Sequence, residues 1–351
     1  MSMICFALFA QTDQIFVHEA TVANSAAGYI TTIDHPDLNG NPNANIFVSH
    51  NYNPGGAGGV LNTNQTGTWY DGTNWTIFNE GFQNIAGTSY NVFISEGSPV
   101  IQVTADGSNY SEVINNGTIN NDPGAVLMMS KYWNPFGVYN TQNYGFWYDD
   151  GDGRWNLYAE DLDPQPINAA YKVLLSPGTG GSEAFVHTAT PANISSNWTQ
   201  IDHPALNGNP DATLVVMHNW GTAGDAANIV LDKVIGVWYT GTHWAIYIED
   251  QSAMTANLEF NVYLMNPTLG TEDNAILGVT IHPNPATDIV NIQANGEISN
   301  ITLFNTLGQE VKAIEVNSTT TSINIANLQA GIYLATIESE VGTETRRIIK
   351  K

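Results

Sequence analysis

Six histidines hold matched positions in two distant parts of the chain, and imidazole is a common ligand of zinc and copper in proteins. They are His18, His35, His50, His187, His203 and His218. If the three in each part converged, with Asp34 or Asp202 as a fourth ligand or as an orienting partner, each part would bind one transition-metal ion. Their spacings match no metal motif. The competing interpretation, which we favour, is that these rings bond backbone groups and have structural roles.

A second group of metal-binding side chains is acidic. Asp149, Asp150 and Asp152 lie in an Asp-Asp-Gly-Asp-Gly segment, which gathers the hard oxygen ligands that Ca²⁺ prefers. The segment lacks the full twelve-residue calcium loop and its closing glutamate. It therefore predicts either a Ca²⁺ site or a longer solvated turn.

Aromatic side chains recur beside amides and suggest a sugar-stacking platform. Trp69, Trp147 and Trp238 each precede a tyrosine, while Tyr52 follows Asn51 and Trp220 follows Asn219. Sugar C–H faces stack on indole rings, and nearby amide oxygens accept hydrogen bonds from hydroxyls. Adjacent residues of a strand point to opposite faces, so one member of each Trp-Tyr pair is expected in the core.

Three glutamates, Glu80, Glu160 and Glu249, are the only acidic residues that recur three times. A carboxylate that acts in hydrolysis usually needs a second one at a suitable distance. No second acidic residue recurs three times, so the sequence predicts a protein that is not an enzyme.

These recurrences arise because the body of the chain is an internal repeat. Trp69 and Trp238 lie 238 − 69 = 169 residues apart, which is room for two units of about 85 residues. We expect copies at 15–95, 99–176 and 183–266. The middle copy is divergent and has Lys131 where the others have His50 and His218.

Each copy is predicted to be all-β. Short apolar runs alternate with segments rich in Gly and Asn, and Asp71-Gly72 supplies the positive φ that a tight hairpin needs. The joints at 95–99 and 176–182 are short and rich in Gly, Ser and Pro. They favour three sandwich-like or barrel-like units strung in a line. The unit resembles a bacterial extracellular repeat of unassigned function, and this resemblance implies no activity.

The tail, 278–351, has its own motifs. It begins with Pro283-Asn284-Pro285, continues through a turn at Gly308 and a Gly331-Ile-Tyr333 segment, and ends in two basic pairs. This order resembles the type A C-terminal sorting domain of type IX secretion cargo in Bacteroidota. The resemblance implies export through the type IX machinery to the cell surface or the medium by way of the periplasm, with removal of the tail. Its alternating apolar positions predict a small Ig-like β-sandwich of about seven strands.

At the other end, residues 1–10 hold an apolar run that includes the single cysteine, Cys5. The run is too short to span a bilayer and is typical of a secretory signal remnant cleaved after Ala10. The mature chain would then lack disulfides and thiol chemistry. We expect no transmembrane segment.

The charge is strongly acidic, with 33 Asp and Glu against 9 Lys and Arg and a net charge of −24. From residue 278 onward five basic and seven acidic residues give −2, so the preceding part carries −22. Such a surface repels nucleic acid and anionic lipid. It suits cations, neutral glycans or simple solubility in salty water.

The sequence therefore predicts a secreted or cell-surface protein whose β-units bind extracellular glycan or matrix without catalysis. The alternatives are a metal-dependent extracellular enzyme that uses the histidine sets and a structural surface or filament subunit. No cofactor is required by the leading hypothesis, although Ca²⁺ or a transition metal would fit the groups named above.

Overall fold

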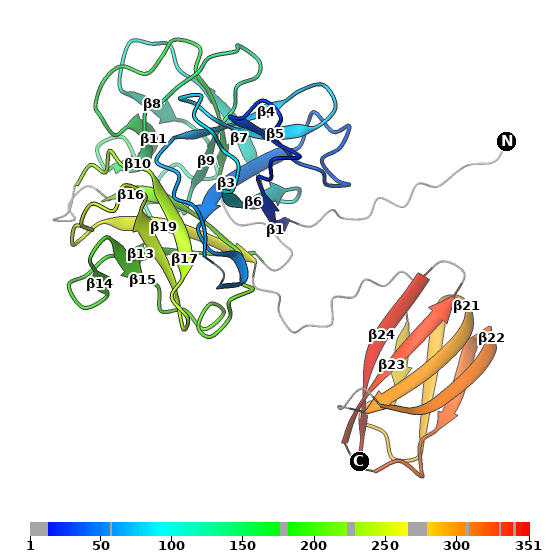
Figure 1. The fold of residues 1–351 in the computed structure, drawn as a ribbon. Helices are drawn as coiled ribbons and strands as arrows, with labels where there is room; N and C mark the ends of the chain where they lie inside the picture. Colours follow the sequence, from blue (N-terminus) through cyan, green and yellow to red (C-terminus); the bar gives the residue numbers. More distant parts are fainter. Residues whose placement is uncertain are drawn as a thin grey trace. The chain divides into compact units, whose positions relative to one another are not determined.

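The computed structural model describes residues 13–56, 58–175, 182–222, 229–265, 279–305, 309–329, 331–339 and 342–351. The chain divides into two compact units, Met1–Asn266 and Pro267–Lys351 (Figure 1). The predicted signal remnant at 1–10, most of the predicted linker at 176–182 and the turn glycine Gly308 lie outside the described residues.

The first unit contains a sheet built from two different copies of the repeat. Its order is β1(Gln14–Glu19), β6(Ser89–Ser95), β3(Asn45–Asn51), β17(Ile235–Tyr239), β18(Trp244–Ile248), β15(Trp198–Gln200) and β14(Ile194–Ser195). The first three strands belong to copy one and the last four to copy three. The two halves meet where β3 and β17 run parallel, with His50 opposite Gly236.

A second sheet joins copies three and two in the same way. Its order is β13(Ser182–Thr188), β19(Glu259–Met265), β16(Leu214–Thr222), β10(Tyr144–Asp149), β11(Arg154–Ala159) and β8(Ser111–Ile114). The halves again meet at a parallel pair, β16 and β10, with His218 opposite Gly145.

The remaining strands join copies two and one and close the ring. One half is β7(Val100–Thr104), β12(Ala170–Leu174) and β9(Met128–Lys131), and the other is β2(Ile30–Thr32), β5(Trp75–Asn79) and β4(Thr66–Tyr70), with a 3₁₀ turn η1(Pro54–Gly56) after β3. A parallel bridge between Thr68 and Tyr132 links β4 to β9. Each copy thus pairs with both others around a pseudo-threefold axis, through continuous sheets at two seams and through a single bridge at the third.

The expectation of separate units in a line is therefore wrong, although the all-β class and the threefold repeat are confirmed. Each copy supplies two half-sheets, and each half-sheet alone would leave a strand edge unpaired at the seam. An unpaired edge is a liability because it presents free N–H and C=O groups. Three copies have six such edges, and pairing them at three seams covers all six, which separate units in a line would not do.

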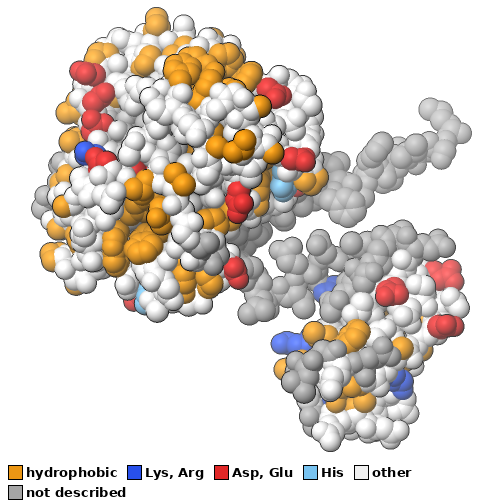
Figure 2. All heavy atoms as spheres, in the orientation of Figure 1, with side chains coloured by type: hydrophobic (Ala, Val, Ile, Leu, Met, Phe, Trp, Pro, Cys, Tyr) orange, Lys and Arg blue, Asp and Glu red, His pale blue; other side chains and the backbone are white. Residues whose placement is uncertain are grey.

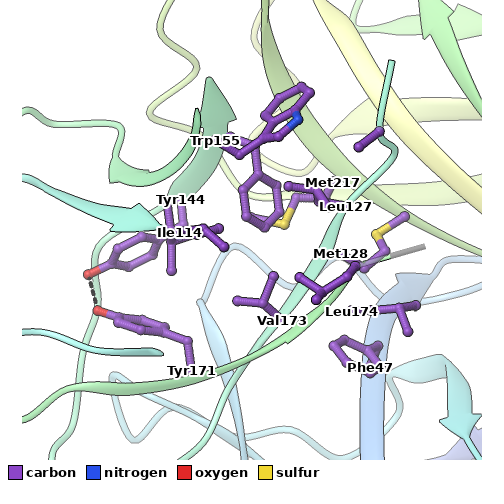
Figure 3. Packing of buried hydrophobic residues seen from close by; sticks show 14 of the residues in the cluster. Phe47, Ile114, Leu127, Met128, Tyr144, Trp155, Tyr171, Val173, Leu174 and Met217 are labelled. Atoms are coloured by element: carbon purple, nitrogen blue, oxygen red, sulfur yellow. Dashed lines mark hydrogen bonds between the residues drawn. The ribbon is translucent and has the colours of Figure 1, made fainter. Parts of the chain in front are cut away.

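The hydrophobic core confirms that the copies interlock. One buried cluster includes Phe47 and Phe93 from copy one, Trp155 from copy two, and Val215 and Tyr263 from copy three (Figure 3). Matched tryptophans, Trp75, Trp155 and Trp244, are among the largest fully buried side chains. Aromatic rings therefore supply much of the buried apolar area, because short strands offer few core positions and large rings fill them best.

The hairpin prediction is also confirmed. β4 and β5 pair with Tyr70 opposite Trp75, and Gly72 in the connecting turn has φ of 104°. In copy three β17 and β18 pair in the same register, and Gly241 has φ of 102°. Only glycine takes this conformation without strain, which explains the shared turn.

The second unit is a five-stranded antiparallel sheet within its described residues. Its strands are β20(Thr280–His282), β21(Ile289–Asn305), β22(Glu310–Asn324), β23(Gly331–Ser339) and β24(Gly342–Lys350). About seven strands were expected. The difference arises because β21 and β22 are long strands that continue through register shifts between Gln293 and Ile298 instead of breaking there. Their alternating apolar residues enclose a separate core that includes Ile301, Ile323 and Ile337.

The proline-rich start of the tail is fastened to the last strand. The amide of Asn284 donates to the Arg347 carbonyl at 2.7 Å, and its oxygen accepts from the backbone N–H of Ile349 at 2.8 Å. The Tyr333 hydroxyl donates to the Gln329 carbonyl at 2.9 Å. Asn284 therefore fastens the start of the tail to β24, and Tyr333 lies at the same end of the sheet, opposite Ile348, while Pro283 and Pro285 are exposed.

Candidate functional site

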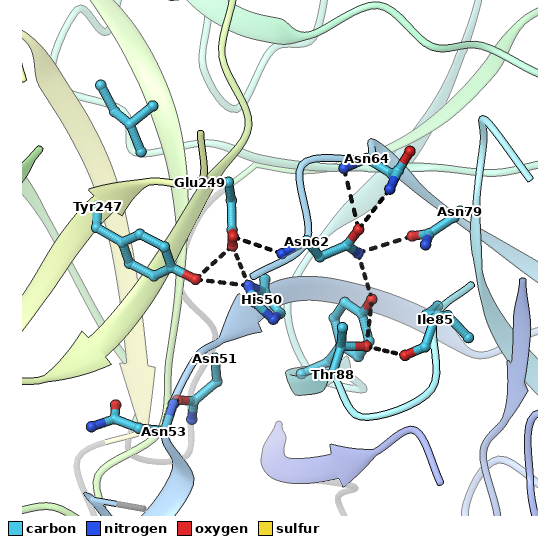
Figure 4. Close-up of polar contacts among 12 residues, drawn as sticks. His50, Asn51, Asn53, Asn62, Asn64, Asn79, Ile85, Thr88, Tyr247 and Glu249 are labelled. Atoms are coloured by element: carbon cyan, nitrogen blue, oxygen red, sulfur yellow. Dashed lines mark hydrogen bonds and ion pairs between the residues drawn. The ribbon is translucent and has the colours of Figure 1, made fainter. Parts of the chain in front are cut away.

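The three recurring glutamates lie at the seams between copies, and they are buried. At the seam of copies one and three, Glu249 accepts a hydrogen bond from the His50 ring at Nδ1, and from the Tyr247 hydroxyl at 2.6 Å (Figure 4). Its second oxygen accepts from the backbone N–H of Asn62 at 2.8 Å. Both His50 and Asn62 belong to copy one, so this carboxylate ties the two copies together.

The seam of copies three and two repeats the arrangement. Glu160 accepts from His218 Nδ1 at 2.5 Å, from the Tyr158 hydroxyl at 2.9 Å and from the backbone N–H of Leu231 at 2.7 Å. Burial, followed by the nearby Glu160 charge, raises the pKa of Tyr158, so its hydroxyl remains a donor. Two of these three donors, His218 and Leu231, belong to copy three, so Glu160 ties copies two and three together.

At the third seam a lysine replaces the histidine. Glu80 accepts from the backbone N–H of Asn140 at 2.8 Å. Burial raises the pKa of Glu80, and the Lys131 charge and this N–H partly offset the rise. Burial likewise lowers the pKa of Lys131 to about 8, against the opposing attraction of Glu80. Lys131 Nζ also donates to the carbonyls of Asn140 and Gln142, both at 2.7 Å.

A glycine beside each glutamate makes this approach sterically feasible. A Cβ added to Gly145 would lie 2.4 Å from Glu160 Oε1, and one added to Gly236 would lie 2.7 Å from Glu249 Oε1. The third member is Gly67, whose added Cβ would lie 2.6 Å from Glu80 Oε1. The Gly-x-Trp-Tyr segments therefore recur because a side chain at their first position would displace the carboxylate.

The other predicted histidines have separate structural partners. His18 and His187 are buried and bond the hydroxyls of Thr31 and Thr199 at 2.8 and 2.9 Å. His35 and His203 stack on phenylalanines, Phe16 and Phe185, with ring centroids 4.3 and 4.6 Å apart. The three histidines of a copy thus contact three different sets of partners and do not form the metal site considered above. In the described part of the chain, no group of three or more His, Cys, Asp or Glu side chains is placed to hold a metal ion.

Burial makes His18 and His187 sensitive to acid. It lowers the pKa of both to about 4, against about 6.5 in the unfolded chain. The unfolded state therefore binds more protons, and stability that is complete above pH 6.5 is lost as the pH falls toward 4. Each histidine contributes about 3 kcal/mol to that loss.

We expect the double variant His18→Gln/His187→Gln, which keeps a hydrogen-bonding group for each threonine, to lose less stability between pH 7 and 4.5 than the wild-type chain. Urea unfolding at several pH values measures this. The control is His35→Gln/His203→Gln, which changes rings that are only half-buried and should retain the loss that His18 and His187 cause. Parallel curves for wild type and H18Q/H187Q would contradict the assignment.

The acidic turn does not gather its three carboxylates. Asp149 accepts from the backbone N–H of Gly151 at 2.8 Å, and Asp152 lies 4.0 Å from Arg154. Asp150 is exposed. The predicted Ca²⁺ site is thus not assembled, and the segment is the solvated turn that was its alternative.

Two of the predicted sugar-binding residues lie in the interior. Asn51 and Asn219 are buried and donate to the side-chain oxygens of Asn91 and Asn261, each at 2.9 Å. Those partner amides donate in turn to backbone carbonyls of other copies, at Leu214 and Leu127. The recurring asparagines fasten copies together, and they are not available to an external ligand.

The predicted aromatic residues are half-buried and line the seams. Trp69 packs edge-on against Trp133, with centroids 5.5 Å apart, and Trp147 packs edge-on against Trp220 at 6.0 Å. Tyr52 contacts Tyr247, and Trp238 contacts Trp198. Tyr148 and Tyr239 are buried, as expected for one member of each Trp-Tyr pair, but in the first pair both Trp69 and Tyr70 are only half-buried.

At the seam of copies one and two these rings form an open pocket of about 130 Å³. Its lining residues are Tyr29, Ile30, Trp69, Phe78, Trp133 and Tyr139. Phe82 extends the aromatic surface, since its ring lies 4.7 Å from Tyr139 and 5.0 Å from Tyr29 between centroids. Phe82 is 54% exposed and Tyr139 41% exposed, so the rim is accessible to a ligand. Trp69 was predicted as part of such a platform.

Among the residues that the structure describes, the other seams have no counterpart of the rim formed by Phe82 and Tyr139. Phe82 has φ of 63°, and the residues with matching positive φ in copies two and three are Leu162 and Gln251. Val230 takes the place of Tyr139 at the seam of copies two and three. Tyr29, Phe78, Phe82 and Tyr139 were not predicted as site residues, because they do not recur in all copies. These residues lie in segments that otherwise recur, so their difference from the matched residues of the other copies is the sequence feature that could have indicated a site.

Comparisons with known proteins agree with the repeat. The profile described as domain of unknown function (DUF7452) matches residues 4–94, 85–175 and 145–264, and the profile described as secretion system C-terminal sorting domain matches residues 280–351. No curated protein matches the chain. Within the described residues, no helix is long and apolar enough to cross a membrane.

Solved structures show only remote likeness. PorZ, a surface component of the type IX secretion system of Porphyromonas gingivalis, is 12% identical with a TM-score of 0.19, over 73% of this chain and 39% of PorZ. The chain thus spans less than half of that protein. A segment of titin is 11% identical with a TM-score of 0.15, over 72% of this chain and 98% of the segment. The BSP domain of a biofilm associated protein is 10% identical with a TM-score of 0.18, over 97% and 81%.

Those TM-scores are too low for any of the three likenesses to bear on the fold or function of this chain. The family profiles, in contrast, cover the whole body and the tail in the places where the structure has three interlocked copies and a separate five-stranded sheet. The chain belongs to the family described as domain of unknown function (DUF7452), which it carries in three copies, and it ends in a type IX sorting domain that directs export to the cell surface or the extracellular space.

Proposed function

We propose that this exported protein binds a neutral extracellular glycan, without catalysis, at the aromatic pocket between copies one and two. The observation that carries the proposal is the group of accessible rings formed by Trp69, Trp133, Tyr139 and Phe82 around a cavity of about 130 Å³. Aromatic faces of this kind stack on the C–H faces of sugar rings. Ligand sites are typically concave, mostly apolar and equipped with few polar groups.

Polar groups at the pocket fit hydroxyl ligands. Tyr29 and Tyr139 contribute hydroxyls, and Trp133 Nε1 is buried without a hydrogen-bond partner among the described residues. Burial, followed by proximity to the Tyr29 hydroxyl, raises the pKa of Tyr139, so the Tyr139 hydroxyl stays neutral at ordinary pH. Neutral hydroxyls both donate and accept, which matches the hydroxyls of a sugar.

The charge of the protein supports a neutral ligand over an anionic one. The chain carries a net charge of −24, and acidic side chains are scattered over the face of the body shown in Figure 2, with few basic ones among them. A field of this sign lowers the local concentration of anionic polymers such as nucleic acid and sulfated or acidic glycans. Neutral polysaccharides are unaffected.

The buried glutamates argue against hydrolysis at the seams. Glu249 and Glu160 are 0 and 2% exposed, and each is engaged by a ring nitrogen, a hydroxyl and a backbone N–H. A general acid or base must reach the proton that it transfers. These carboxylates have structural partners on both oxygens, so they join copies and do not face a substrate.

We expect the double variant Phe82→Ala/Tyr139→Ala to bind its polysaccharide at least about tenfold more weakly, because each stacked ring contributes about 1 kcal/mol or more. The measurement is retention of full-length protein on a panel of neutral polysaccharides, with and without EDTA, followed by calorimetric titration of the best ligand. Both side chains are largely exposed, so the fold should persist, with circular dichroism as the check.

The matched control is Leu162→Ala/Val230→Ala. These residues hold the corresponding exposed places at the next seam and are 47 and 40% exposed. Their loss removes similar apolar area without removing a ring, and binding should stay within about twofold. Equal weakening by both double variants, or no retention of wild-type protein on any neutral polymer, would refute the proposal.

A further inference from the structure

The seams converge on a cavity of about 110 Å³ at the pseudo-threefold axis. The same short segment of each copy lines it, residues 48–50, 129–131 and 216–218, so the third position is His50 in copy one, Lys131 in copy two and His218 in copy three. β3 and β16 are in direct contact here, since the Val216 N–H donates to the Ser49 hydroxyl at 2.8 Å. The two histidines therefore come from different copies but share one cavity.

Each of these histidines has one ring nitrogen that is used and one that is not. Nδ1 of His50 and of His218 is bonded to a glutamate, on the side of the ring away from Nε2. Both Nε2 atoms are buried and have no hydrogen-bond partner among the described residues. The residues are only 5 and 3% exposed. A buried polar atom without a partner is costly, and in a native protein it usually has an unseen one.

The hydrogen bonds to the glutamates determine which ring nitrogen of each histidine carries the hydrogen. A glutamate oxygen accepts a hydrogen bond from Nδ1, so Nδ1 carries the hydrogen, and in that tautomer Nε2 presents a lone pair. This carboxylate–histidine unit is the arrangement that orients metal-bound imidazoles and makes them more basic. It occurs twice around one cavity, and each carboxylate is itself held by a tyrosine hydroxyl and a backbone N–H.

The two free imidazole nitrogens determine which ion fits best. Imidazole ligands select zinc, copper or nickel over calcium and magnesium. The charged residues that line the cavity are Lys131 and Lys233, and Lys233 Nζ pairs with Asp250 at 2.6 Å.

We propose that His50 Nε2 and His218 Nε2 bind one divalent transition-metal ion in the axial cavity, with water completing its coordination. Lys131 occupies the place where a third imidazole would complete the set. The lysine donates to the Asn140 and Gln142 carbonyls and to Gln65 Oε1, so it closes that side of the cavity instead of ligating. The site joins copies one and three and is independent of the glycan pocket.

The test is titration of metal-free, full-length protein with ZnCl₂ by calorimetry, and electron paramagnetic resonance of the protein loaded with one equivalent of Cu²⁺. One equivalent of Zn²⁺ should bind, and the Cu²⁺ spectrum should report two nitrogen ligands. His218→Gln should abolish that equivalent. The control His35→Gln/His203→Gln, which removes two half-buried surface imidazoles, should leave both results unchanged.

Lys131→His keeps the proposal testable even if H218Q fails to fold. It installs the residue that the other two copies already have at this position, so the fold should accept it. A third imidazole should tighten Zn²⁺ binding by about tenfold or more and add a third nitrogen to the Cu²⁺ spectrum. The proposal is overturned if wild type takes up no Zn²⁺, if folded H218Q still binds it, if H35Q/H203Q loses it, or if K131H leaves affinity and spectrum unchanged.

Discussion

Replacing Glu249 by glutamine is expected to lower the free energy of unfolding of the body by about 3–5 kcal/mol. Glu249 is fully buried and accepts from His50, Tyr247 and the Asn62 backbone. Glutamine keeps the shape but presents an amide donor to groups that are themselves donors. The loss is large because breaking one side of a buried pair leaves the other side desolvated and unpaired.

The measurement is equilibrium urea unfolding of the full chain at pH 7. Glu19→Gln is the control, since Glu19 is an exposed residue on β1, and it should change stability by less than about 0.5 kcal/mol. Glu80→Gln should also destabilise the body, because it leaves the buried Lys131 without its neighbouring carboxylate. A loss below about 1 kcal/mol for E249Q would show that this carboxylate does not hold copies one and three together.

Much of the fold could be predicted from local signals. Period-two alternation located the short strands, and the Asp-Gly and Thr-Gly turns located the hairpins. Matched tryptophans such as Trp69 and Trp238 fixed the repeat length. These signals depend on neighbours within a few residues, so one sequence carries them in full.

The joining of copies could not be predicted in this way. A half-sheet has the same alternating pattern whether its edge meets its own copy or the next one. The short joint at 95–99 suggested separate beads, yet it connects β6 of one sheet to β7 of another. The recurring Gly67 and Glu80 were a usable signal, because a glycine and a glutamate that always recur together indicate close packing against a carboxylate.

The candidate site was also predictable only in part, because some of its features are local in the sequence and others depend on how the copies join. Recurrence led to the histidines, but it grouped them by copy. His50 and His218 in fact meet across the axis, and only the closed ring brings them together. For the aromatic pocket, recurrence pointed to Trp69 but passed over Phe82 and Tyr139, since the other copies have aliphatic or polar residues there.

The closed ring of three copies is the central claim, and differential scanning calorimetry of the full chain tests it most directly. If the copies share sheets, the body must unfold as one cooperative unit. Its calorimetric enthalpy, about 170 kcal/mol at roughly 0.7 kcal/mol per residue over about 250 residues, should then equal its van't Hoff enthalpy. The tail, a separate compact unit, should contribute a smaller transition of its own.

Three independent units would behave differently. Each copy of about 85 residues would melt with a van't Hoff enthalpy near 60 kcal/mol, so the ratio of calorimetric to van't Hoff enthalpy for the body would be about three. The interlocked ring predicts a ratio close to one for the body transition. A ratio near three would contradict it.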